Sequence, residues 1–204
     1  SIKPFKLCSI AETLVTEFAP LAKGKRLTFT VENQANEIVS GDKNRIISIG
    51  SNLLSNAIKF TKNGTVALTT EYTDNTFTLI VEDTGTGMTK EQQQRIFTPF
   101  ERLGNAVTED GFGLGLTIVS DTVKLLKGNI RVESEPGKGS HFTVSLPLPK
   151  AEETTATEKT NAKHSTLSGC SVLAITAQRS SAKLRPRRPE QSMMNVQTSI
   201  CANF

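Results

Sequence analysis

Apolar residues recur every three or four positions in three stretches of the chain, and this spacing places them on one face of an α-helix. Asp42 is a favourable N-cap for the second of these helices, and Gly24 and Gly128 are suitable C-caps for the first and the third. The pattern predicts helices over residues 5–22, 42–59 and 114–127.

Elsewhere apolar and polar residues alternate, which is the period of a β-strand with one buried face. The alternation predicts one hairpin that turns at Asp74-Asn75 and a second that turns at Glu135-Pro136-Gly137. Within the polar stretch between them, Thr89 and Gln92 predict a capping box at the start of a short helix. The predicted strands cover residues 27–31, 66–72, 76–82, 130–133 and 141–146.

These elements favour an α+β fold, in which a mixed and mostly antiparallel sheet packs on three helices as a two-layer α/β sandwich. Long loops are uncommon inside a compact domain unless they are functional, so the polar stretch over 85–113 is expected to be a functional lid. After residue 150 the composition becomes rich in Thr, Ala, Glu and Lys without apolar periodicity. We therefore predict a domain over 1–150 and a linker over 151–168, followed by a strand signal within 169–175 and a disordered basic tail to 204.

The charge and the apolar content exclude several classes of protein. Residues 1–150 carry 17 basic and 16 acidic side chains, whereas residues 151–204 carry 7 and 4. Such a nearly neutral domain is not expected to bind nucleic acid. No apolar run approaches the roughly 18 residues of a membrane span, so we expect a soluble chain without membrane contact. The three cysteines lie far apart, which predicts free thiols.

Two groups of residues have chemistry that suits a nucleotide. Asp83 ends a predicted strand and enters a turn with Gly85 and Gly87, where a carboxylate accepts a hydrogen bond from an amine and glycines let a ligand approach the backbone. Asn52 and Asn56 lie one helical turn apart, and their amide oxygens are hard ligands that suit Mg²⁺. An ordinary turn after a strand and a polar helix face are the simpler explanations of these two patterns.

Two further features suit phosphate groups. Lys59 lies near Asn56 on the same predicted helix, and Gly111, Gly113 and Gly115 open the helix that follows the polar stretch. The N-terminus of such a helix offers unpaired N–H groups and a positive dipole end to anions. A solvated lysine at a helix end and glycine hinges in a loop are the alternative readings.

Four short motifs occur in one order within about 65 residues. Together they resemble the N, G1, F and G2 boxes of the catalytic domain of sensor histidine kinases, which belong to the superfamily shared with gyrase and Hsp90. A glycine turn over 137–142 resembles the last conserved turn of that domain, and the resemblance covers nearly all of residues 1–150. The four boxes are Asn52–Ala57, Asp83–Gly87, Phe97–Phe100 and Gly111–Leu116.

The resemblance implies a Bergerat-type fold with a bound Mg²⁺ and ATP. It implies that Asp83 binds the adenine amine, that Asn56 ligates Mg²⁺, and that Asn52 and Lys59 lie near the phosphates as catalytic residues. It assigns further nucleotide contacts to a set of residues around the pocket, namely Gly85, Gly87, Gly113, Leu114, Gly115 and Ser140.

In this family the γ-phosphate passes to a histidine on a separate helical hairpin and then to a receiver domain of a response regulator. Neither His141 nor His164 is followed by the acidic residue typical of an acceptor histidine. We therefore expect a monomeric, cytoplasmic kinase domain that does not phosphorylate itself and needs a phosphoacceptor hairpin as partner. A regulatory nucleotide-binding module or a truncated product without kinase output remains an alternative. A gyrase-type ATPase is disfavoured, because Asn52 stands where hydrolysing relatives have a glutamate base.

The segment Cys170–Ile175 resembles the first strand of a receiver domain, as in hybrid kinases. A receiver would continue with paired aspartates, whereas this chain continues with Thr176-Ala177. We interpret 169–175 as an interrupted receiver start and the residues after about 175 as out-of-frame or rearranged sequence. The basic run over 179–188 is expected to be part of a disordered tail.

Overall fold

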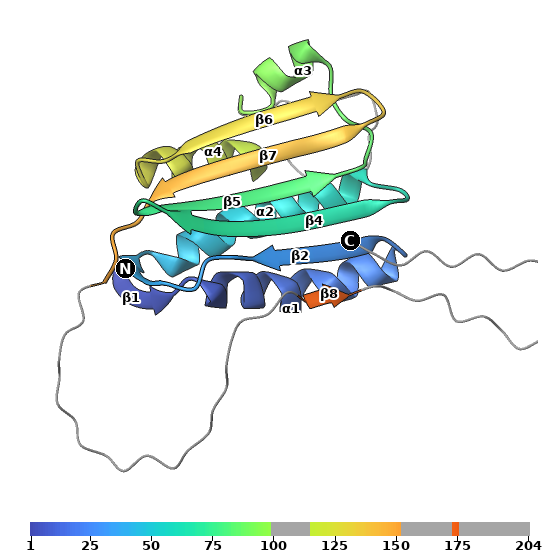
Figure 1. The fold of residues 1–204 in the computed structure, drawn as a ribbon. Helices are drawn as coiled ribbons and strands as arrows, with labels where there is room; N and C mark the ends of the chain where they lie inside the picture. Colours follow the sequence, from blue (N-terminus) through green and yellow to red (C-terminus); the bar gives the residue numbers. More distant parts are fainter. Residues whose placement is uncertain (99–114, 152–172, 176–204) are drawn as a thin grey trace, which may run out of the picture.

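The computed structural model describes residues 1–98, 115–151 and 173–175. The three longer helices lie on one side of a sheet, and the other side of the sheet faces the viewer in Figure 1. The elements are β1 (Lys3–Lys6), α1 (Cys8–Gly24), β2 (Thr28–Asn33), β3 (Ile38–Gly41), α2 (Lys43–Phe60), β4 (Thr65–Thr73), β5 (Thr76–Asp83), α3 (Lys90–Arg95), α4 (Gly115–Leu125), β6 (Asn129–Glu135), β7 (Gly139–Pro147) and β8 (Leu173–Ile175).

The main sheet has the strand order β6-β7-β5-β4-β2-β8 and is mixed. β2 and β4 run parallel, and the other neighbouring pairs are antiparallel. The helix that joins the parallel pair is α2, as a crossover between parallel strands requires. The predicted two-layer α+β fold with a mixed, mostly antiparallel sheet is therefore confirmed.

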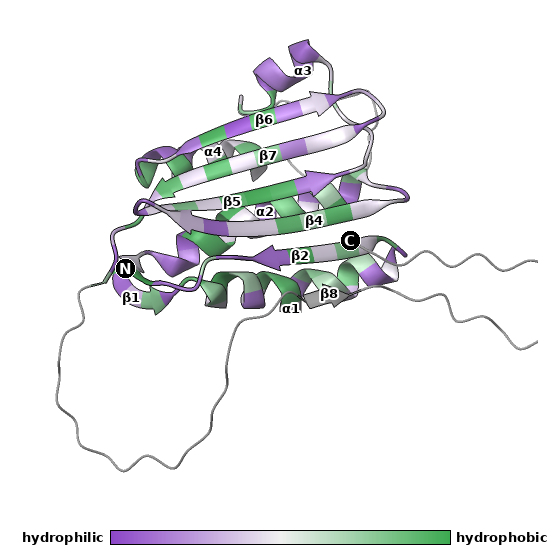
Figure 2. Ribbon diagram, in the orientation of Figure 1, coloured by the Kyte–Doolittle hydropathy of each residue, from purple (hydrophilic) through white to green (hydrophobic). Residues whose placement is uncertain are grey.

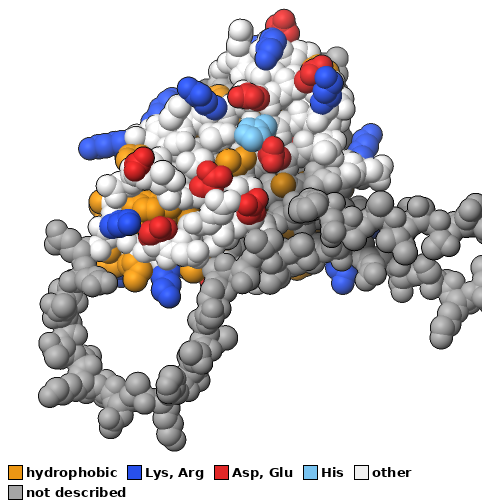
Figure 3. All heavy atoms as spheres, in the orientation of Figure 1, with side chains coloured by type: hydrophobic (Ala, Val, Ile, Leu, Met, Phe, Trp, Pro, Cys, Tyr) orange, Lys and Arg blue, Asp and Glu red, His pale blue; other side chains and the backbone are white. Residues whose placement is uncertain are grey.

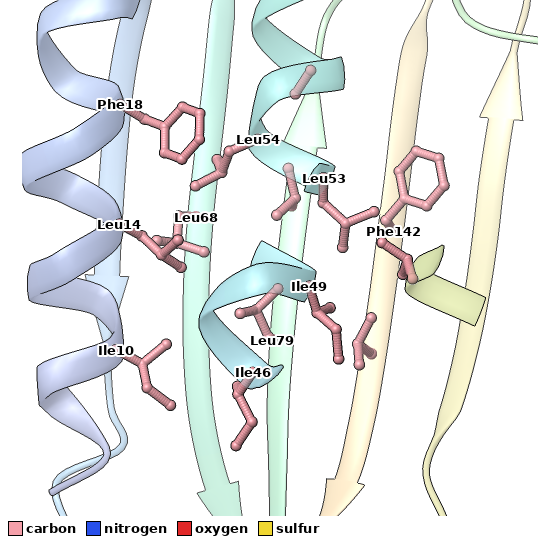
Figure 4. Close-up of a cluster of buried hydrophobic side chains, with 14 of the residues drawn as sticks. Ile10, Leu14, Phe18, Ile46, Ile49, Leu53, Leu54, Leu68, Leu79 and Phe142 are labelled. Atoms are coloured by element: carbon pink, nitrogen blue, oxygen red, sulfur yellow. The ribbon is translucent and has the colours of Figure 1, made fainter. Parts of the chain in front are cut away.

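The core lies between the sheet and the helices α1 and α2. Leu14 of α1, Leu53 of α2 and Leu68 of β4 are almost completely buried, and Figure 4 shows such side chains pointing into the space between the two layers. Gly50 lets α1 and α2 approach closely, because a Cβ atom there would lie 2.5 Å from a methyl group of Leu14. This packing fixes α2 against the sheet, and α2 carries most of the N box.

Several locally encoded features agree with the sequence. The Asp42 side chain accepts a hydrogen bond from the backbone N–H of Arg45 at the start of α2. Asp74 and Asn75 both have positive φ, as expected in the two-residue turn between β4 and β5. Thr89 and Gln92 form the predicted capping box at the start of α3. This short helix is hydrophilic along its length (Figure 2) and has no buried residue.

The first predicted helix begins too early in the sequence. Lys3–Lys6 form β1, which pairs with β3 in a separate two-stranded sheet, and α1 begins only at Cys8. Phe5 shares the apolar spacing of the helix but is paired with Val39 across this small sheet. β3 itself has no counterpart in the sequence prediction. Both strands are four residues long, too short to show a clear alternation.

The predicted glycine C-caps were also wrong in detail. α1 ends with Arg26 in the left-handed conformation (φ 60°), and Leu27 N–H donates to Ala22 O. α4 ends in the same way with Lys127 (φ 57°), and Gly128 N–H donates to Val123 O. Both ends are Schellman motifs with a basic residue at the position that usually holds glycine. Gly24 is the last residue of α1 rather than its cap.

The strand signal after the linker lies at the edge of the main sheet. Leu173–Ile175 form β8, which pairs antiparallel with Phe29–Val31 of β2. The predicted linker lies outside the described residues except for Ala151, whose N–H donates to Ile38 O of β3. The rest of the interpretation of 169–204 as a receiver start and tail stays a prediction.

Candidate nucleotide site

Asp83 is the last residue of β5 and lies on the helix side of the sheet. It continues the buried series of Leu79 and Val81, which alternate with outward-facing residues. Its neighbours across the sheet are Val66 on β4 and Ser140 on β7. The strand therefore delivers a carboxylate to the end of the apolar core, as the alternation predicts.

The surroundings of this carboxylate act on its protonation in opposite directions. Burial raises the pKa of Asp83, because a low-dielectric site disfavours the charged form. Hydrogen bonds from the backbone N–H groups of Gly85 and Ser140 lower the pKa of Asp83, but burial is the larger effect. The Gly85 N–H lies 2.8 Å from Asp83 Oδ1. The other carboxylate oxygen is not the one that the Gly85 N–H binds, and it can accept a hydrogen bond from an external donor.

Three glycines let backbone segments meet around Asp83. A Cβ atom on Gly85 would lie 2.6 Å from Phe60 O at the end of α2. Gly87 (φ 62°) and Gly139 (φ 96°) have positive φ, and a Cβ atom on either would overlap a backbone carbonyl oxygen. At Gly87 and Gly139, glycine is required both because neighbouring backbone leaves no space for a Cβ atom and because φ is positive. The turn after β5 is thus held against both α2 and the β6–β7 hairpin.

The N box meets the start of α4. Asn52 and Asn56 lie one turn apart on α2, partly buried, and α2 packs against α4. Asn52 Nδ2 donates to Ser48 O at 2.8 Å, which orients its Oδ1 away from that carbonyl. A Cβ atom on Gly115 would lie 3.0 Å from Asn52 Oδ1. The Asn52 amide oxygen therefore lies against the N-terminal turn of α4.

Lys59 is exposed at the end of α2, with its Nζ 5.8 Å from the centroid of the Phe60 ring. The carbonyl groups at this helix end are bound by a second lysine that the sequence analysis missed. Lys25 Nζ donates to Ile58 O at 2.9 Å and to Lys59 O at 3.3 Å. A lysine in the turn between a helix and a strand has no sequence signal for this contact, because the partner lies 33 residues away.

Some predicted site residues lie outside the described part of the chain, namely Gly111, Gly113 and Leu114. The same holds for most of the predicted lid and for Pro99 and Phe100 of the F box. Phe97 is described, and it is partly buried against the core. Of the predicted nucleotide-contacting residues that the structure describes, Asp83, Gly85, Gly87 and Ser140 form one group. Asn52, Asn56, Lys59 and Gly115 form a second group along α2 and the start of α4.

The predicted surface histidine lies on the opposite face of the sheet. His141 Nδ1 is 2.7 Å from Glu82 Oε1, and His141 Nε2 is 3.1 Å from Thr143 Oγ1. Figure 3 shows a histidine with acidic side chains gathered around it on this face. A hollow of about 690 Å³ there is lined by residues including Glu82, Glu133 and His141. Asp83, Ser134 and Ser140 also border this hollow.

No group of His, Cys, Asp and Glu in residues 1–98, 115–151 and 173–175 is arranged to hold a metal ion. No helix in the same residues has the length and apolar character of a membrane span.

The protonation of Asp83 gives a testable pH dependence. Because burial raises its folded-state pKa above 3.8, the neutral form stabilises the folded chain at low pH, and this contribution is lost as the pH rises through the folded-state pKa. Asp83→Asn removes the titration. In urea unfolding, the variant is expected to gain stability relative to the wild type as the pH rises past 3.8. Asp74→Asn, at the exposed turn, is the matched control, and equal profiles for all three proteins would contradict the prediction.

Comparison with known proteins agrees with this geometry. Residues 41–150 match the family described as histidine kinase-, DNA gyrase B-, and HSP90-like ATPase. The sensor protein GacS of Pseudomonas syringae pv. syringae is 36% identical over 159 residues, which cover 74% of this chain and 18% of GacS. The sensor histidine kinase RcsC of Escherichia coli (strain K12) is 35% identical over 154 residues, which cover 74% of this chain and 16% of RcsC. The chain thus spans less than a fifth of the length of these relatives.

Solved structures show the same fold. Full-length ShkA in complex with AMPPNP aligns with a TM-score of 0.66 and 30% identity, covering 74% of this chain and 32% of ShkA. The catalytic domain of the histidine kinase ThkA aligns with a TM-score of 0.63 and 25% identity, covering 72% of this chain and 95% of that domain. The chain therefore belongs to the histidine kinase-, DNA gyrase B- and HSP90-like ATPase family and contains a catalytic ATP-binding domain of the sensor histidine kinase type.

Proposed function

We propose that this chain binds Mg·ATP between Asp83 and the N-terminus of α4 and donates the γ-phosphate to a histidine on a separate helical hairpin. The observation that carries the proposal is the position of Asp83. Its half-buried carboxylate lies at the end of β5, on the same side of the sheet as α2 and α4. Family membership and the likeness to the AMPPNP complex of ShkA support it.

Different residues of the site bind different parts of the nucleotide. Asp83 accepts a hydrogen bond from the adenine amine through the oxygen that Gly85 does not occupy. The N-terminal N–H groups of α4, opened by Gly115, bind the phosphates. Asn56, one turn after Asn52, would hold Mg²⁺ through its side-chain amide oxygen. The bound ion would neutralise charge on the phosphates.

The same residues favour transfer of the phosphoryl group over hydrolysis. Asn52 has no basic group to deprotonate a water molecule, and its Nδ2 donates to Ser48 O, so Oδ1 faces Gly115. Catalysis then consists of positioning and charge neutralisation, in which Lys59 serves as a cation near the γ-phosphate. The chemical acceptor must come from another polypeptide segment, the phosphoacceptor hairpin, and a receiver domain would take the phosphate from it.

Phosphotransfer in trans tests this proposal. We expect that the chain, incubated with radiolabelled Mg·ATP and the dimerisation hairpin of GacS, places acid-labile label on the hairpin and none on itself. The hairpin with its acceptor histidine changed to glutamine is the control and should stay unlabelled. Acid-labile label on this chain in the absence of the hairpin would contradict the proposal, and binding of ATP without any transfer would favour a regulatory module.

A further inference from the structure

Ser134 near the end of β6 lies at the centre of a hydrogen-bond network beside Asp83. Its hydroxyl donates to Gly139 O at 2.7 Å and accepts from Met88 N–H at 2.8 Å. Its Oγ also lies 3.1 Å from Ser140 Oγ. Ser134 was not singled out by any sequence motif. Its hydrogen bonds join Met88, after the turn that follows β5, to Gly139 and Ser140 at the start of β7.

The number of hydroxyl hydrogens determines which serine donates in the contact between Ser134 and Ser140. A serine hydroxyl has a single hydrogen, and Ser134 uses it on the Gly139 carbonyl, which can only accept. The hydrogen between the two serine oxygens must therefore come from Ser140. Because the Ser140 proton is directed to Ser134, the remaining surface of Ser140 Oγ offers lone pairs only.

Ser140 lies beside Asp83 on the same face of the sheet, because the two residues are paired across β7 and β5. An ionised carboxylate is also an acceptor without a donor. This corner of the site therefore presents acceptors from two side chains and no side-chain donor. A ligand edge that matches it must carry N–H groups, whereas a carbonyl oxygen in the same place would meet unfavourable lone pairs.

We propose that Ser134 is a positioning residue that fixes the Ser140 hydroxyl as an acceptor, so that the site selects a purine with an amine at C6 over a purine with a carbonyl at C6. The proposal deepens the proposed function and rests on it. Ser134 acts through Ser140 and does not itself contact the base.

The rest of the network holds Ser134 in place. Gln93 Nε2 donates to Ser134 O at 2.8 Å and to Met88 O at 3.1 Å, which ties α3 to β6. The Met88 side chain is buried, with 7% of its surface exposed. Gly139 is held against the backbone of Asp83 and has no space for a side chain. The acceptor of the Ser134 proton is therefore fixed by the backbone, and the hydroxyl has little freedom to reverse.

ATP and ITP are the suitable probes, because ATP carries an amine at C6 and an acceptor nitrogen at N1, whereas ITP carries a carbonyl at C6 and an N–H at N1. The dissociation constants of Mg·ATP and Mg·ITP are measured for the wild type and for Ser134→Ala, Ser134→Thr and Ser145→Ala. Ser134→Ala frees the Ser140 proton to point at the ligand, so the preference for ATP should fall about fivefold, the size of one neutral hydrogen bond. Ser134→Thr keeps the hydroxyl and should restore the preference. Ser145→Ala, on the outward face of the same hairpin, should match the wild type.

The outcomes separate this proposal from the proposed function. A wild-type chain that binds neither nucleotide contradicts both proposals. A wild-type chain that prefers ATP, together with a Ser134→Ala variant that keeps the full preference, overturns only the role of Ser134. An equal loss of affinity for both nucleotides in Ser134→Ala would show a purely structural role and would also overturn it. Faster hydrogen exchange of the Met88 amide in Ser134→Ala checks the hydrogen bond without any nucleotide, and an unchanged rate would contradict the network.

Discussion

Replacing Asp83 with asparagine is expected to weaken Mg·ATP binding by about 50-fold, the middle of the range for a hydrogen bond to a charged group. The Gly85 N–H already occupies Oδ1 of residue 83. An asparagine that keeps this bond must place its NH₂ group where the other carboxylate oxygen lay. Two donors, the amide and the adenine amine, would then face each other. Isothermal titration calorimetry measures the change.

The matched control for this substitution is Glu82→Gln. Glu82 is the preceding residue on β5, but it faces the opposite side of the sheet, where it contacts His141. The Glu82→Gln substitution removes the same charge at nearly the same position in the chain and should leave ATP affinity unchanged. Equal affinities for Asp83→Asn and the wild type would contradict the assignment of Asp83, provided that circular dichroism shows both proteins folded.

The largest effect on stability is expected from Gly139→Ala. Gly139 has φ 96°, and a Cβ atom there would overlap the carbonyl oxygen of Asp83. Neither backbone can move freely, because Gly139 is paired with Glu135 on β6 and Ser140 with Asp83 on β5. We expect the free energy of unfolding to fall by about 3–5 kcal/mol, from backbone displacement together with strain at positive φ.

Gly137→Ala separates these two causes. Gly137 lies in the same turn with φ 79°, but nothing lies within 4 Å of a Cβ atom at that position. Only the conformational strain applies there, and it should cost about 1–2 kcal/mol. Urea unfolding of both variants measures the difference. Equal losses for the two alanine variants would show that the close approach of Gly139 to Asp83 is not a constraint.

The parts of the fold that local sequence encodes could be predicted. Asp42 begins α2, Asp74 and Asn75 form the tight turn between β4 and β5, and Thr89 caps α3. In each case one or two side chains determine the backbone nearby, so the signal is present in the sequence itself. The alternation of apolar residues likewise predicted the strand that ends at Asp83.

The parts that depend on distant residues could not be predicted. β1 exists because β3 pairs with it, and Phe5 therefore sits in a strand although its spacing fits the helix that follows. Arg26 and Lys127 take the left-handed conformation at helix ends where a neighbouring glycine was expected to do so. In this conformation the next residue donates to the carbonyl that closes the helix, Leu27 to Ala22 and Gly128 to Val123.

The candidate site also combines features that local sequence encodes with features that depend on distant residues. The motifs identified Asp83, Asn52 and Asn56, because their chemistry and spacing are visible in the sequence. Ser134 accepts from the Met88 N–H and Lys25 donates to Ile58 O. Both partners are backbone groups far along the chain, and such partners have no sequence signature. Residues that support the pocket through backbone contacts, such as Ser134 and Lys25, can therefore be identified only from the three-dimensional structure.

The central claim is that this chain binds ATP at the Asp83 end of the sheet. It is tested most directly by titrating the whole chain with Mg·ATP while following the backbone amides of Gly85 and Ser140 by NMR. Saturable shifts of both amides, absent in Asp83→Asn, are the predicted result. Saturable binding that leaves these two amides unshifted, or no binding by a folded chain, would contradict the account.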